Sequence, residues 1–367
     1  MKKPRILFIA TFPPPIHGSS IVSNQIKDSA IFKDAFEADY LNLGTSRCMD
    51  EIGKKNILLN LKKLFRFMEI FFRCSILLLT HKYDLCYCAI TCRGLGFLKD
   101  APIVLLCKLF IHRIVIHQHN KGMSEYVDKP VYRWLLPLVY KNVKVILLSW
   151  YLYPDIERIV DKKNVLICPN GIKPQEELDF VRKSSDTLNI LYLSNLMIDK
   201  GVFVLLDALK ILRDKEYSFI CNFVGSETKD INTAYFNVQV EERGLTNYVK
   251  YHGRKYGKDK DEFYKRAEVF VLPSFNEAFP LVNIEAMEYS LPIISTHVGG
   301  IPDEVIDGVT GYIVEPKNAY ALANSIEELL VNPSLRIKMG TASRKLFEEK
   351  FTEEIFVKRF IECLQSV

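Results

Sequence analysis

The sequence predicts an α/β protein made of two doubly wound domains, each built on a parallel sheet. Short apolar runs of strand length alternate with longer segments of helical periodicity, which is the pattern of parallel βαβ units. A chain of 367 residues is also long enough for two domains of ordinary size. Such sheets bind ligands at the carboxyl ends of their strands, so we expect the two domains to face a central cleft that holds the active site.

The expected strands fall into two sets separated by a polar, turn-rich stretch at residues 169–187. The first set is Arg5–Ala10, Asp84–Ile90, Ile114–His119, Lys144–Ser149 and Val165–Cys168. The second set is Leu188–Leu193, Ser218–Val224, Val249–His252, Val269–Leu272, Ile293–Ser295 and Tyr312–Val314. We therefore expect one domain at residues 1–178 and another at 179–351. Residues 352–367 form a last helix, capped by Thr352, whose pattern permits it to cross back onto the first domain.

The charges are unevenly distributed between the two halves of the chain. Residues 1–178 contain 26 Lys and Arg against 16 Asp and Glu, a net charge of +10. The remaining residues contain 23 against 28, a net charge of −5. The first domain is therefore expected to face an anionic partner. Nucleic acid is the least favoured candidate, because the basic residues do not follow a recognised binding module.

The cysteines and the apolar runs indicate a cytoplasmic protein. The nine cysteines are odd in number, scattered, and without paired CxxC spacing, which favours a reduced core over a zinc site. The first apolar run is only a strand long and polar residues follow it, unlike a signal peptide. No run reaches the roughly 18 uncharged apolar residues of a spanning helix.

Residues 56–79 form a strongly apolar helical pattern with one basic stripe. At about 100° per residue, four basic side chains fall close to one meridian: Lys55, Lys62, Arg66 and Arg73. Aromatic side chains and a methionine occupy much of the rest. Two interpretations stay open. The segment is either a core helix with one solvated face, or a helix that lies on an anionic membrane surface.

Two glutamates, Glu277 and Glu285, stand eight residues apart between an expected strand and an expected helix. Pro280 suits the first turn of that helix, where its missing N–H costs nothing. The free amides of the first turn then form an anion site at the end of the strand. Glu277 lies on the loop, and Glu285 lies within reach of the two hydroxyls of a ribose. A phosphate site flanked by two carboxylates suits a nucleotide-sugar.

Two further loops follow expected strands. After Leu188–Leu193, Lys200 and Gly201 begin a helix, and Lys200 offers a mobile charge to a diphosphate. After the first strand, Gly18 allows close backbone approach, and Ser19 or Ser20 caps the next helix. Each of these is also compatible with an ordinary βα turn.

Two other patterns resemble metal sites. His117 and His119 point the same way from an expected strand, but no third ligand is evident. His119 ends the strand, where it can bond a substrate hydroxyl, and His117 is expected inside the sheet. The segment Asp259-Lys260-Asp261 lies in a charged loop, and we interpret it as capping and solvation. We expect no metal at either place.

Taken together, these residues resemble the retaining glycosyltransferase family four, whose members have the GT-B fold of two Rossmann-like domains. The resemblance is strongest from about Leu188 to Phe351. Its most specific element is the E-x7-E motif at Glu277 and Glu285. Further matching segments are Leu272-Pro273-Ser274, Val298-Gly299-Gly300-Ile301-Pro302, Gly308…Gly311-Tyr312 and Pro169-Asn170-Gly171.

The resemblance implies roles for individual residues. Glu277 and His119 contact the transferred sugar at the reaction centre, and Glu285 binds the ribose. The diphosphate is held by Lys200, by Gly18 and by the backbone around the helix start. The base lies near Arg254. The implied donor-binding set is Gly18, Asn195, Lys200, Arg254, Ala278, Phe279, Pro280, Leu281, Val282 and Glu285. One departure is Ser194-Asn195, where the family usually has Gly-Arg, so a charged contact to the diphosphate is missing.

The expected function is transfer of a sugar, with retention, from a nucleotide-diphosphate-sugar to a hydroxyl, without a metal or other cofactor. The basic first domain favours a saccharide or a polyprenyl-diphosphate-linked acceptor in surface polysaccharide assembly. In that case the protein lies in the cytoplasm or on the inner face of the plasma membrane. Three alternatives remain: a non-catalytic nucleotide-sugar-binding subunit, a nucleotide-sugar 2-epimerase, and a phosphorylase, which needs a lysine-bound pyridoxal cofactor.

Overall fold

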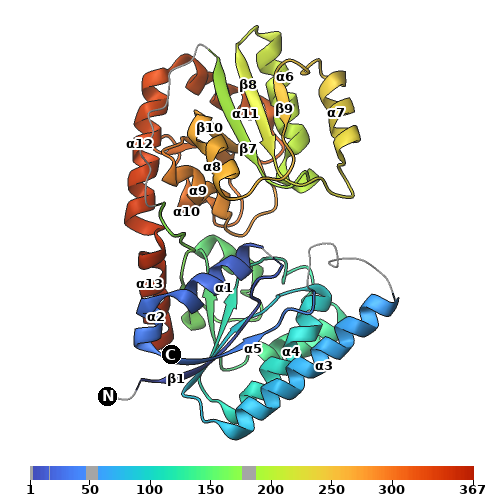
Figure 1. The fold of residues 1–367 in the computed structure, drawn as a ribbon, viewed down its shortest axis with the longest axis vertical. Coiled ribbons are helices and arrows are strands. Elements are labelled where there is room, and N and C mark those ends of the chain that lie inside the picture. Colours follow the sequence, from blue (N-terminus) through green and yellow to red (C-terminus); the bar gives the residue numbers. More distant parts are fainter. Residues whose placement is uncertain (1–2, 16, 47–56, 176–186) are drawn as a thin grey trace. The chain divides into compact units, whose positions relative to one another are not determined.

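The computed structural model describes residues 3–15, 17–46, 57–175 and 187–367, and the chain divides into two compact units (Figure 1). The first unit is Met1–Lys173 together with Glu353–Val367, and the second is Pro174–Thr352. The division therefore falls at 173/174, whereas the sequence placed it at 178/179. The predicted position lies among residues 176–186, outside the described residues.

The first unit contains a six-stranded sheet in the order β2-β1-β3-β4-β5-β6, in which all neighbours are parallel. Its strands are β1 (Arg5–Ala10), β2 (Glu37–Asn42), β3 (Leu85–Ala89), β4 (Ile114–Gln118), β5 (Lys144–Leu147) and β6 (Val165–Ile167). Its α-helices are α1 (Gly18–Asp28), α2 (Ala30–Ala35), α3 (Ile57–Thr80), α4 (Gly94–Phe110), α5 (Pro130–Tyr140) and α13 (Glu353–Gln365). None of the helices in the described residues combines the length and hydropathy needed to cross a membrane.

Strand β2 was not among the strands predicted from the sequence. This strand begins with the polar run Glu37-Ala38-Asp39 and pairs only with β1, at the edge of the sheet. Most of its side chains stay partly exposed. An edge strand can keep polar side chains in water, so a search for apolar runs does not find it. The five predicted strands are present: β1 has the predicted ends, and the ends of the other four differ by at most two residues.

The two faces of the first sheet carry different helices. The chain moves outward from β1 to β2 and then in the opposite direction through β3, β4 and β5. Right-handed crossovers therefore place α1 and α2 on one face and α3, α4 and α5 on the other. Helix α13 joins the first set: it packs against α2, and the ring of Phe360 lies 5.0 Å from that of Tyr87 and 6.4 Å from that of Phe8.

The second unit contains a parallel sheet in the order β12-β11-β10-β7-β8-β9. Its strands are β7 (Leu188–Leu193), β8 (Phe219–Val224), β9 (Val249–Tyr251), β10 (Val269–Leu272), β11 (Ile293–Thr296) and β12 (Gly311–Val314). Its helices are the 3₁₀ turn η4 (Ile198–Lys200) and α6 (Val202–Asp214), α7 (Thr233–Glu242), α8 (Gly257–Arg266), α9 (Leu281–Glu288), α10 (Ile301–Glu304), α11 (Ala319–Val331) and α12 (Pro333–Lys350). Each predicted strand is present within one residue at either end.

The order of the second sheet reverses between two neighbouring strands. From β7 the chain proceeds to β8 and β9 on one side, and from β10 to β11 and β12 on the other. Loops that leave β7 and β10 at their carboxyl ends therefore diverge, which leaves room for a ligand between them. The Lys200 segment follows β7, and the Glu277 segment follows β10. The fold thus brings both predicted segments to one switch point.

Eight of the nine cysteines lie in the described residues, and all eight are buried and free of disulfides. Cys48 lies outside the described residues. The Sγ atoms of Cys74 and Cys107 approach to 3.9 Å between α3 and α4. In the described residues, no group of three His, Cys, Asp or Glu side chains is arranged to hold a metal ion.

Candidate functional site

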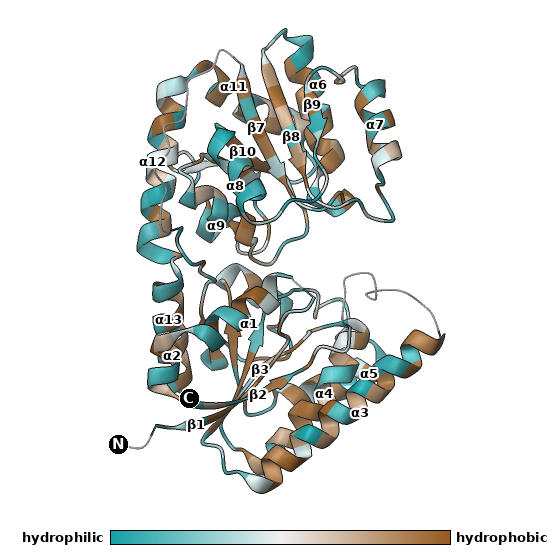
Figure 2. Cartoon of the chain, in the orientation of Figure 1, coloured by the Kyte–Doolittle hydropathy of each residue, from teal (hydrophilic) through white to brown (hydrophobic). Residues whose placement is uncertain are grey.

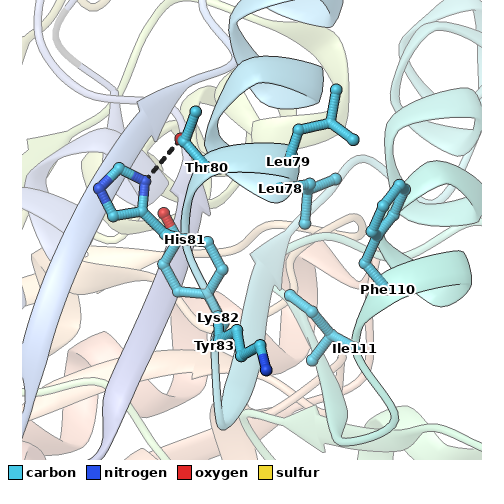
Figure 3. Close-up of a pocket in the computed structure, with 8 residues that line it drawn as sticks. All are labelled: Leu78, Leu79, Thr80, His81, Lys82, Tyr83, Phe110 and Ile111. Carbon is cyan, nitrogen blue, oxygen red and sulfur yellow. Dashed lines mark hydrogen bonds between the residues drawn. The ribbon is translucent and has the colours of Figure 1, made fainter.

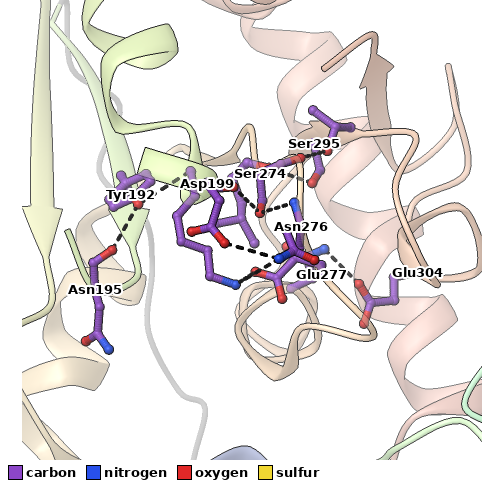
Figure 4. Close-up of polar contacts among 12 residues, drawn as sticks. Tyr192, Asn195, Asp199, Ser274, Asn276, Glu277, Ser295 and Glu304 are labelled. Atoms are coloured by element: carbon purple, nitrogen blue, oxygen red, sulfur yellow. Dashed lines mark hydrogen bonds and ion pairs between the residues drawn. The ribbon is translucent and has the colours of Figure 1, made fainter. Parts of the chain in front are cut away.

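An ion pair lies at the switch point of the second sheet. The Nζ of Lys200, at the end of η4, lies 2.5 Å from the Oε1 of Glu277 and donates to the carbonyl of Asn276 at 3.2 Å (Figure 4). Both side chains are partly buried. From the sequence, Lys200 was predicted to offer a mobile charge to a diphosphate, and this stays a prediction. In the protein without ligand, the carboxylate of Glu277 holds the ammonium group.

The loop before Lys200 is clamped to the loop before Glu277. The carbonyl of Asp199 accepts hydrogen bonds from the Oγ of Ser274 and from the amide of Phe275, each at 2.9 Å. The side chain of Asn276 donates to the carboxylate of Asp199 at 3.2 Å. These bonds fix the distance between two segments that are remote in the sequence. The ammonium group therefore keeps its place beside Glu277.

A glycine makes this clamp sterically feasible. Gly201 has φ +75°, and a Cβ at this position would lie 2.1 Å from the carbonyl oxygen of Pro273. Gly201 is the residue before α6, so that helix begins at Val202 and not at Lys200 as the sequence predicted. Only glycine combines this backbone conformation with such a close approach.

The segment after β11 supports the Glu277 loop from behind. The amide of Gly300 donates to the carbonyl of Ala278 at 2.6 Å. A Cβ at Gly299 would lie 2.2 Å from the carbonyl oxygen of Glu277, and one at Gly300 would lie 2.4 Å from the ring of Phe279. The two glycines therefore let the backbone press directly against the loop that carries the glutamate.

Helix α9 begins immediately after that loop. Pro280 is its N-cap residue, and Leu281 and Val282 form its start. The first amides of a helix have no acceptor within the helix and carry a partial positive charge. The N-terminus of α9 therefore presents Leu281 and Val282 as donors next to the Lys200–Glu277 pair. Phe279, in contrast, has a buried side chain that anchors the loop.

Glu285 lies about one turn further along α9. Its carboxylate accepts from the Nζ of Lys260 at 2.8 Å and from the hydroxyl of Tyr264 at 2.8 Å, both from α8. The interpretation of Asp259-Lys260-Asp261 as a solvated loop was therefore wrong: the segment lies within α8. A single basic residue between two acids gave no sign of its partner, which is 25 residues away in the chain.

A buried carboxyl group below the site was missed by the sequence analysis. Glu304, in α10, is fully buried, and its Oε2 accepts from the Nδ2 of Asn283 in α9 at 2.7 Å (Figure 4). Burial raises the pKa of Glu304 well above its usual range, and the charge of Glu277 adds to the effect. Burial therefore favours the protonated form of this carboxyl group. Nothing in the local sequence distinguishes Glu304 from a solvated glutamate at a helix end.

Two predicted donor residues lie elsewhere on the second unit. Asn195 is exposed, its Oδ1 accepts from the amide of Ser226 at 3.2 Å, and it lies apart from Glu277 (Figure 4). Arg254 is also exposed, and its guanidinium group lies 4.5 Å from the ring centre of Tyr256. Their roles in donor binding stay predictions.

In the first unit, Gly18 is the first residue of α1. The cap of this helix is His17, and not Ser19 or Ser20 as predicted. The Nδ1 of His17 accepts from the amide of Ser20 at 3.3 Å, and the amide of His17 donates to the Oγ of Ser20 at 3.0 Å. Ser20 therefore takes the third helical position of a capping box. A histidine side chain takes the place of the usual hydroxyl at the cap, so a search for Ser or Thr caps in the sequence did not identify it.

His119 follows β4 directly, and its ring centre lies 4.0 Å from that of His117. His117 is fully buried and shares a hydrogen bond of 2.9 Å with the hydroxyl of Tyr87, as expected for a residue inside the sheet. Both ring nitrogens of His119 are buried without a partner among the described residues. Burial, with a contribution from His17, lowers the pKa of His119 to about 4. The imidazole is therefore neutral, and its two ring nitrogens make no hydrogen bond among the described residues.

Residues 174–346 match the family model described as glycosyl transferases group 1. The match spans nearly all of the second unit, including the Lys200–Glu277 pair and α9. The second unit belongs to the group 1 glycosyltransferase family. The narrower assignment to family four stays a prediction. That Gly18 and His119 contribute to the same active site as residues of the second unit also stays a prediction.

Two curated relatives come from surface polysaccharide synthesis. The chain is 35% identical over 175 residues to the capsular polysaccharide biosynthesis glycosyltransferase CapM of Staphylococcus aureus, covering 47% of this chain and 44% of the relative. It is 26% identical over 275 residues to the lipopolysaccharide 1,2-N-acetylglucosaminetransferase of Salmonella typhimurium, covering 69% of this chain and 67% of the relative. The chain therefore spans only about half to two thirds of these relatives.

Solved structures match the whole chain. A sucrose-phosphate synthase from Thermosynechococcus elongatus superimposes with a TM-score of 0.77 at 20% identity, over 99% of both chains. Anabaena HepE in complex with UDP superimposes with a TM-score of 0.76 at 18% identity, over 99% of this chain and 100% of HepE. At such identities the likeness shows the fold alone. The predicted two-domain α/β fold, GT-B, is confirmed.

Proposed function

We propose that this protein is a glycosyltransferase that moves a sugar from a nucleotide-diphosphate-sugar to a hydroxyl group and retains the anomeric configuration. The observation that carries the proposal is the arrangement in the group 1 unit. An ammonium group, a carboxylate and the open N-terminus of α9 lie together where the sheet order reverses. An anionic leaving group and a polyhydroxyl sugar need this combination.

The diphosphate would bind to the amides of Leu281 and Val282 and to the ammonium group of Lys200. Negative charge grows on the diphosphate as the bond to the sugar breaks, and fixed donors stabilise that charge without reorganisation. In the ligand-free protein Glu277 holds Lys200 in place. When the donor binds, the diphosphate competes for the same ammonium group, and Glu277 becomes available to the hydroxyls of the sugar.

In the proposed step, the bond from the anomeric carbon to the diphosphate breaks while the acceptor oxygen forms a new bond on the same face. The proton of the acceptor hydroxyl passes to the departing diphosphate oxygen. Glu277 orients the sugar and stabilises its positive charge, and the neutral His119 bonds a sugar hydroxyl. Glu285, already positioned by Lys260, holds the ribose. The chemistry proposed for these residues requires no metal or other cofactor.

The acceptor we propose is a saccharide, carried on a polyprenyl diphosphate, in the assembly of a surface polysaccharide. Two observations support this class. The relatives named above act in capsule and lipopolysaccharide synthesis. The first 178 residues also carry the net charge of +10, which suits a diphosphate-linked acceptor. The proposed location is the cytoplasm, with contact at the inner face of the membrane.

Thermal-shift measurements with UDP-, GDP-, TDP- and CMP-sugars test the donor site. HepE has been solved with UDP-glucose, so UDP-sugars come first. At a concentration of about 100 times Kd, a ligand stabilises the native state by about 2.7 kcal/mol. We expect Lys200→Ala to abolish most of the shift. Lys210→Ala, which removes an exposed lysine of α6, is the matched control and should keep it.

The alternatives give different results in the same assays. A non-catalytic subunit would bind the donor in wild-type and Glu277→Ala forms alike, and neither would transfer sugar to any acceptor extract. An epimerase would release an isomeric sugar without an acceptor, and a phosphorylase would need pyridoxal bound to a lysine. Sugar transfer that is lost in Glu277→Ala, with the configuration retained in the product, would support the proposal over all three.

A further inference from the structure

The outer face of α3 exposes a continuous apolar stripe. Phe65 is 75% exposed and Phe72 is 68% exposed, and further exposed residues lie on the same side: Leu61, Leu64, Met68, Ile76 and Leu79. At about 100° per residue, these side chains cover an arc of roughly 120°. The buried residues Cys74 and Leu78 lie on the side of the helix that packs toward α4. The helix is therefore apolar toward the core and apolar again toward the outside.

Helices α4 and α5 extend this apolar face. Helix α4 packs between α3 and α5. Leu109 and Phe110 are exposed at the end of α4, and α5 exposes Val131 and Trp134, the latter at 70%. Figure 2 shows hydrophobic segments along the length of α3, with hydrophilic ones between them. A soluble protein rarely leaves so many large apolar side chains on neighbouring helices in water unless something covers them.

Basic side chains border the apolar arc. Helix α3 carries four of them and a single acid, Glu69. Lys62 and Arg73 are exposed along one edge of the arc, while Arg66 on the same edge donates to the carbonyl of Thr45 at 2.6 Å. Lys129 and Arg133 are exposed around the start of α5. Glu69 is exposed on the same edge of α3, so three basic residues stand there against one acid, and the edge keeps a net positive charge.

A pocket lies where α3 and α4 end. It has a volume of about 520 Å³, and its wall combines the apolar side chains of Leu78, Phe110 and Ile111 with His81 and Lys82 (Figure 3). Apolar walls with a cationic group suit a molecule that has an apolar part and an anionic group. This pocket opens beside Leu79, at one end of the exposed stripe.

We propose that the outer face of α3, α4 and α5 docks on the surface of an anionic lipid bilayer. Charge decides among the possible occupants. An apolar arc with lysine and arginine along one edge matches acyl chains below a layer of negative headgroups. A second copy of this chain would place the same basic borders against each other. The proposal does not rest on the proposed transferase activity, because it uses no residue of the Lys200–Glu277 site.

Flotation of the full chain with lipid vesicles tests the proposal. Vesicles of phosphatidylcholine with about a third phosphatidylglycerol should carry the wild-type protein to the top of the gradient, and pure phosphatidylcholine should carry much less. The double variant Phe65→Ser/Phe72→Ser should weaken binding by about tenfold or more, because it removes two large apolar side chains from the contact. Lys62→Glu/Arg73→Glu should abolish the preference for phosphatidylglycerol.

The matched control is Tyr320→Ser/Ile337→Ser in the second unit. These side chains are 74% and 71% exposed, so the control removes comparable apolar surface at another place, and vesicle binding should stay unchanged. Thermal stability and UDP-sugar binding should persist in all variants, which separates a failure of docking from a failure of the donor site.

Three results would overturn the proposal. The first is a wild-type protein that does not float with anionic vesicles. The second is a Phe65→Ser/Phe72→Ser variant that floats as well as the wild type. The third is a wild-type dimer, seen by sedimentation, that this variant dissociates, because a second copy would then cover the face.

Discussion

At the scale of single residues, the candidate site keeps each of its charges paired until a ligand arrives. Lys200 holds Glu277, and Lys260 holds Glu285, at 2.5 and 2.8 Å. A partly buried charge without a partner loses solvation without compensation, so both acids are stabilised by a neighbouring lysine. If Lys200 binds the donor as proposed, the diphosphate competes with the carboxylate of Glu277 for the ammonium group.

This competition predicts an unusual effect of Glu277→Gln. The variant should bind UDP more tightly than the wild type, by roughly threefold to tenfold, because the internal competitor for Lys200 is gone. Sugar transfer should nevertheless fall strongly, since the variant lacks the carboxylate that we propose to act on the sugar. Isothermal titration calorimetry measures the first effect. Asp214→Asn frees the exposed Lys210 in the same way and should leave UDP affinity unchanged. Equal or weaker UDP binding by Glu277→Gln would contradict the competition.

A second residue-scale prediction concerns Glu288, at the end of α9. Burial raises the pKa of Glu288 to about 7, although it accepts from the amide of Gln175 at 2.5 Å. A raised pKa means that the folded state binds the proton more tightly, so stability falls as the pH rises from about 4.5 to about 7. The Glu288→Gln variant has no carboxyl group at this position, so it does not lose stability in this way as the pH rises.

The stability of Glu288→Gln relative to wild type should therefore increase across that pH interval. The upper limit is about 3 kcal/mol, since one pKa unit corresponds to about 1.4 kcal/mol. Urea unfolding at several pH values measures the difference. A difference that stays constant between pH 4.5 and pH 7 would show that this carboxyl group titrates normally in the folded state.

At the scale of elements, the site depends on how closely two loops after β7 and β10 approach each other. Gly201 and the bonds to Asp199 bring the backbones together, and the Gly299-Gly300 step presses on the Glu277 loop from the other side. The strands themselves only direct the loops to the same end of the sheet. The final position of Lys200 is therefore set by backbone contacts that a side chain on these glycines would prevent.

Gly201→Ala tests this dependence. The new Cβ would meet the carbonyl of Pro273, so we expect a loss of stability of about 2–4 kcal/mol, made up of left-handed backbone strain and overlap. Gly257→Ala is the matched control. Gly257 also has a positive φ, +49°, but nothing lies within 4 Å of its added Cβ, so only the strain of about 1–2 kcal/mol remains. Chemical denaturation compares the two, and equal losses would exclude the close approach as a cause.

At the scale of the whole molecule, the chain forms two units with separate cores, and its last helix belongs to the first. The family model covers residues 174–346, whereas the structural matches cover 99% of the chain. The second unit thus retains a sequence that the family model recognises, while for the first unit only the fold is shared. The first unit is also where the exposed apolar face lies.

The Phe360→Ala variant should show, in a calorimeter, whether the two units unfold independently of each other. Phe360 is fully buried against rings of the first unit, so its truncation should cost about 3–5 kcal/mol there. UDP affinity, which we propose to depend on the second unit, should stay within about twofold of wild type. Phe347→Ala, at a fully buried position of α12, is the counterpart that should lower the stability of the second unit. If Phe360→Ala destroyed UDP binding, the units would not be energetically distinct.

Much of this organisation was predictable because it is local in the sequence. Apolar runs identified eleven of the twelve strands in the described residues, and the E-x7-E spacing identified Glu277 and Glu285. The edge strand β2 was missed because its polar side chains face water. The cap of α1 was missed because a histidine takes the place of a hydroxyl. Glu304 was missed because burial, and not residue type, raises the pKa of its carboxyl group.

By itself, the sequence determined the alternation of strands and helices, the division into two halves of opposite charge, and the two glutamates beside a helix start. Only the tertiary structure decided which charges meet. Lys200 and Glu277 are 77 residues apart, and Lys260 and Glu285 are 25 apart. Their pairing follows from strand order and from backbone contacts at glycines, and the exposure of the α3 stripe follows from which side of the helix packs on α4. Neither is encoded in local spacing, because both depend on chain segments that only the packed sheet brings together.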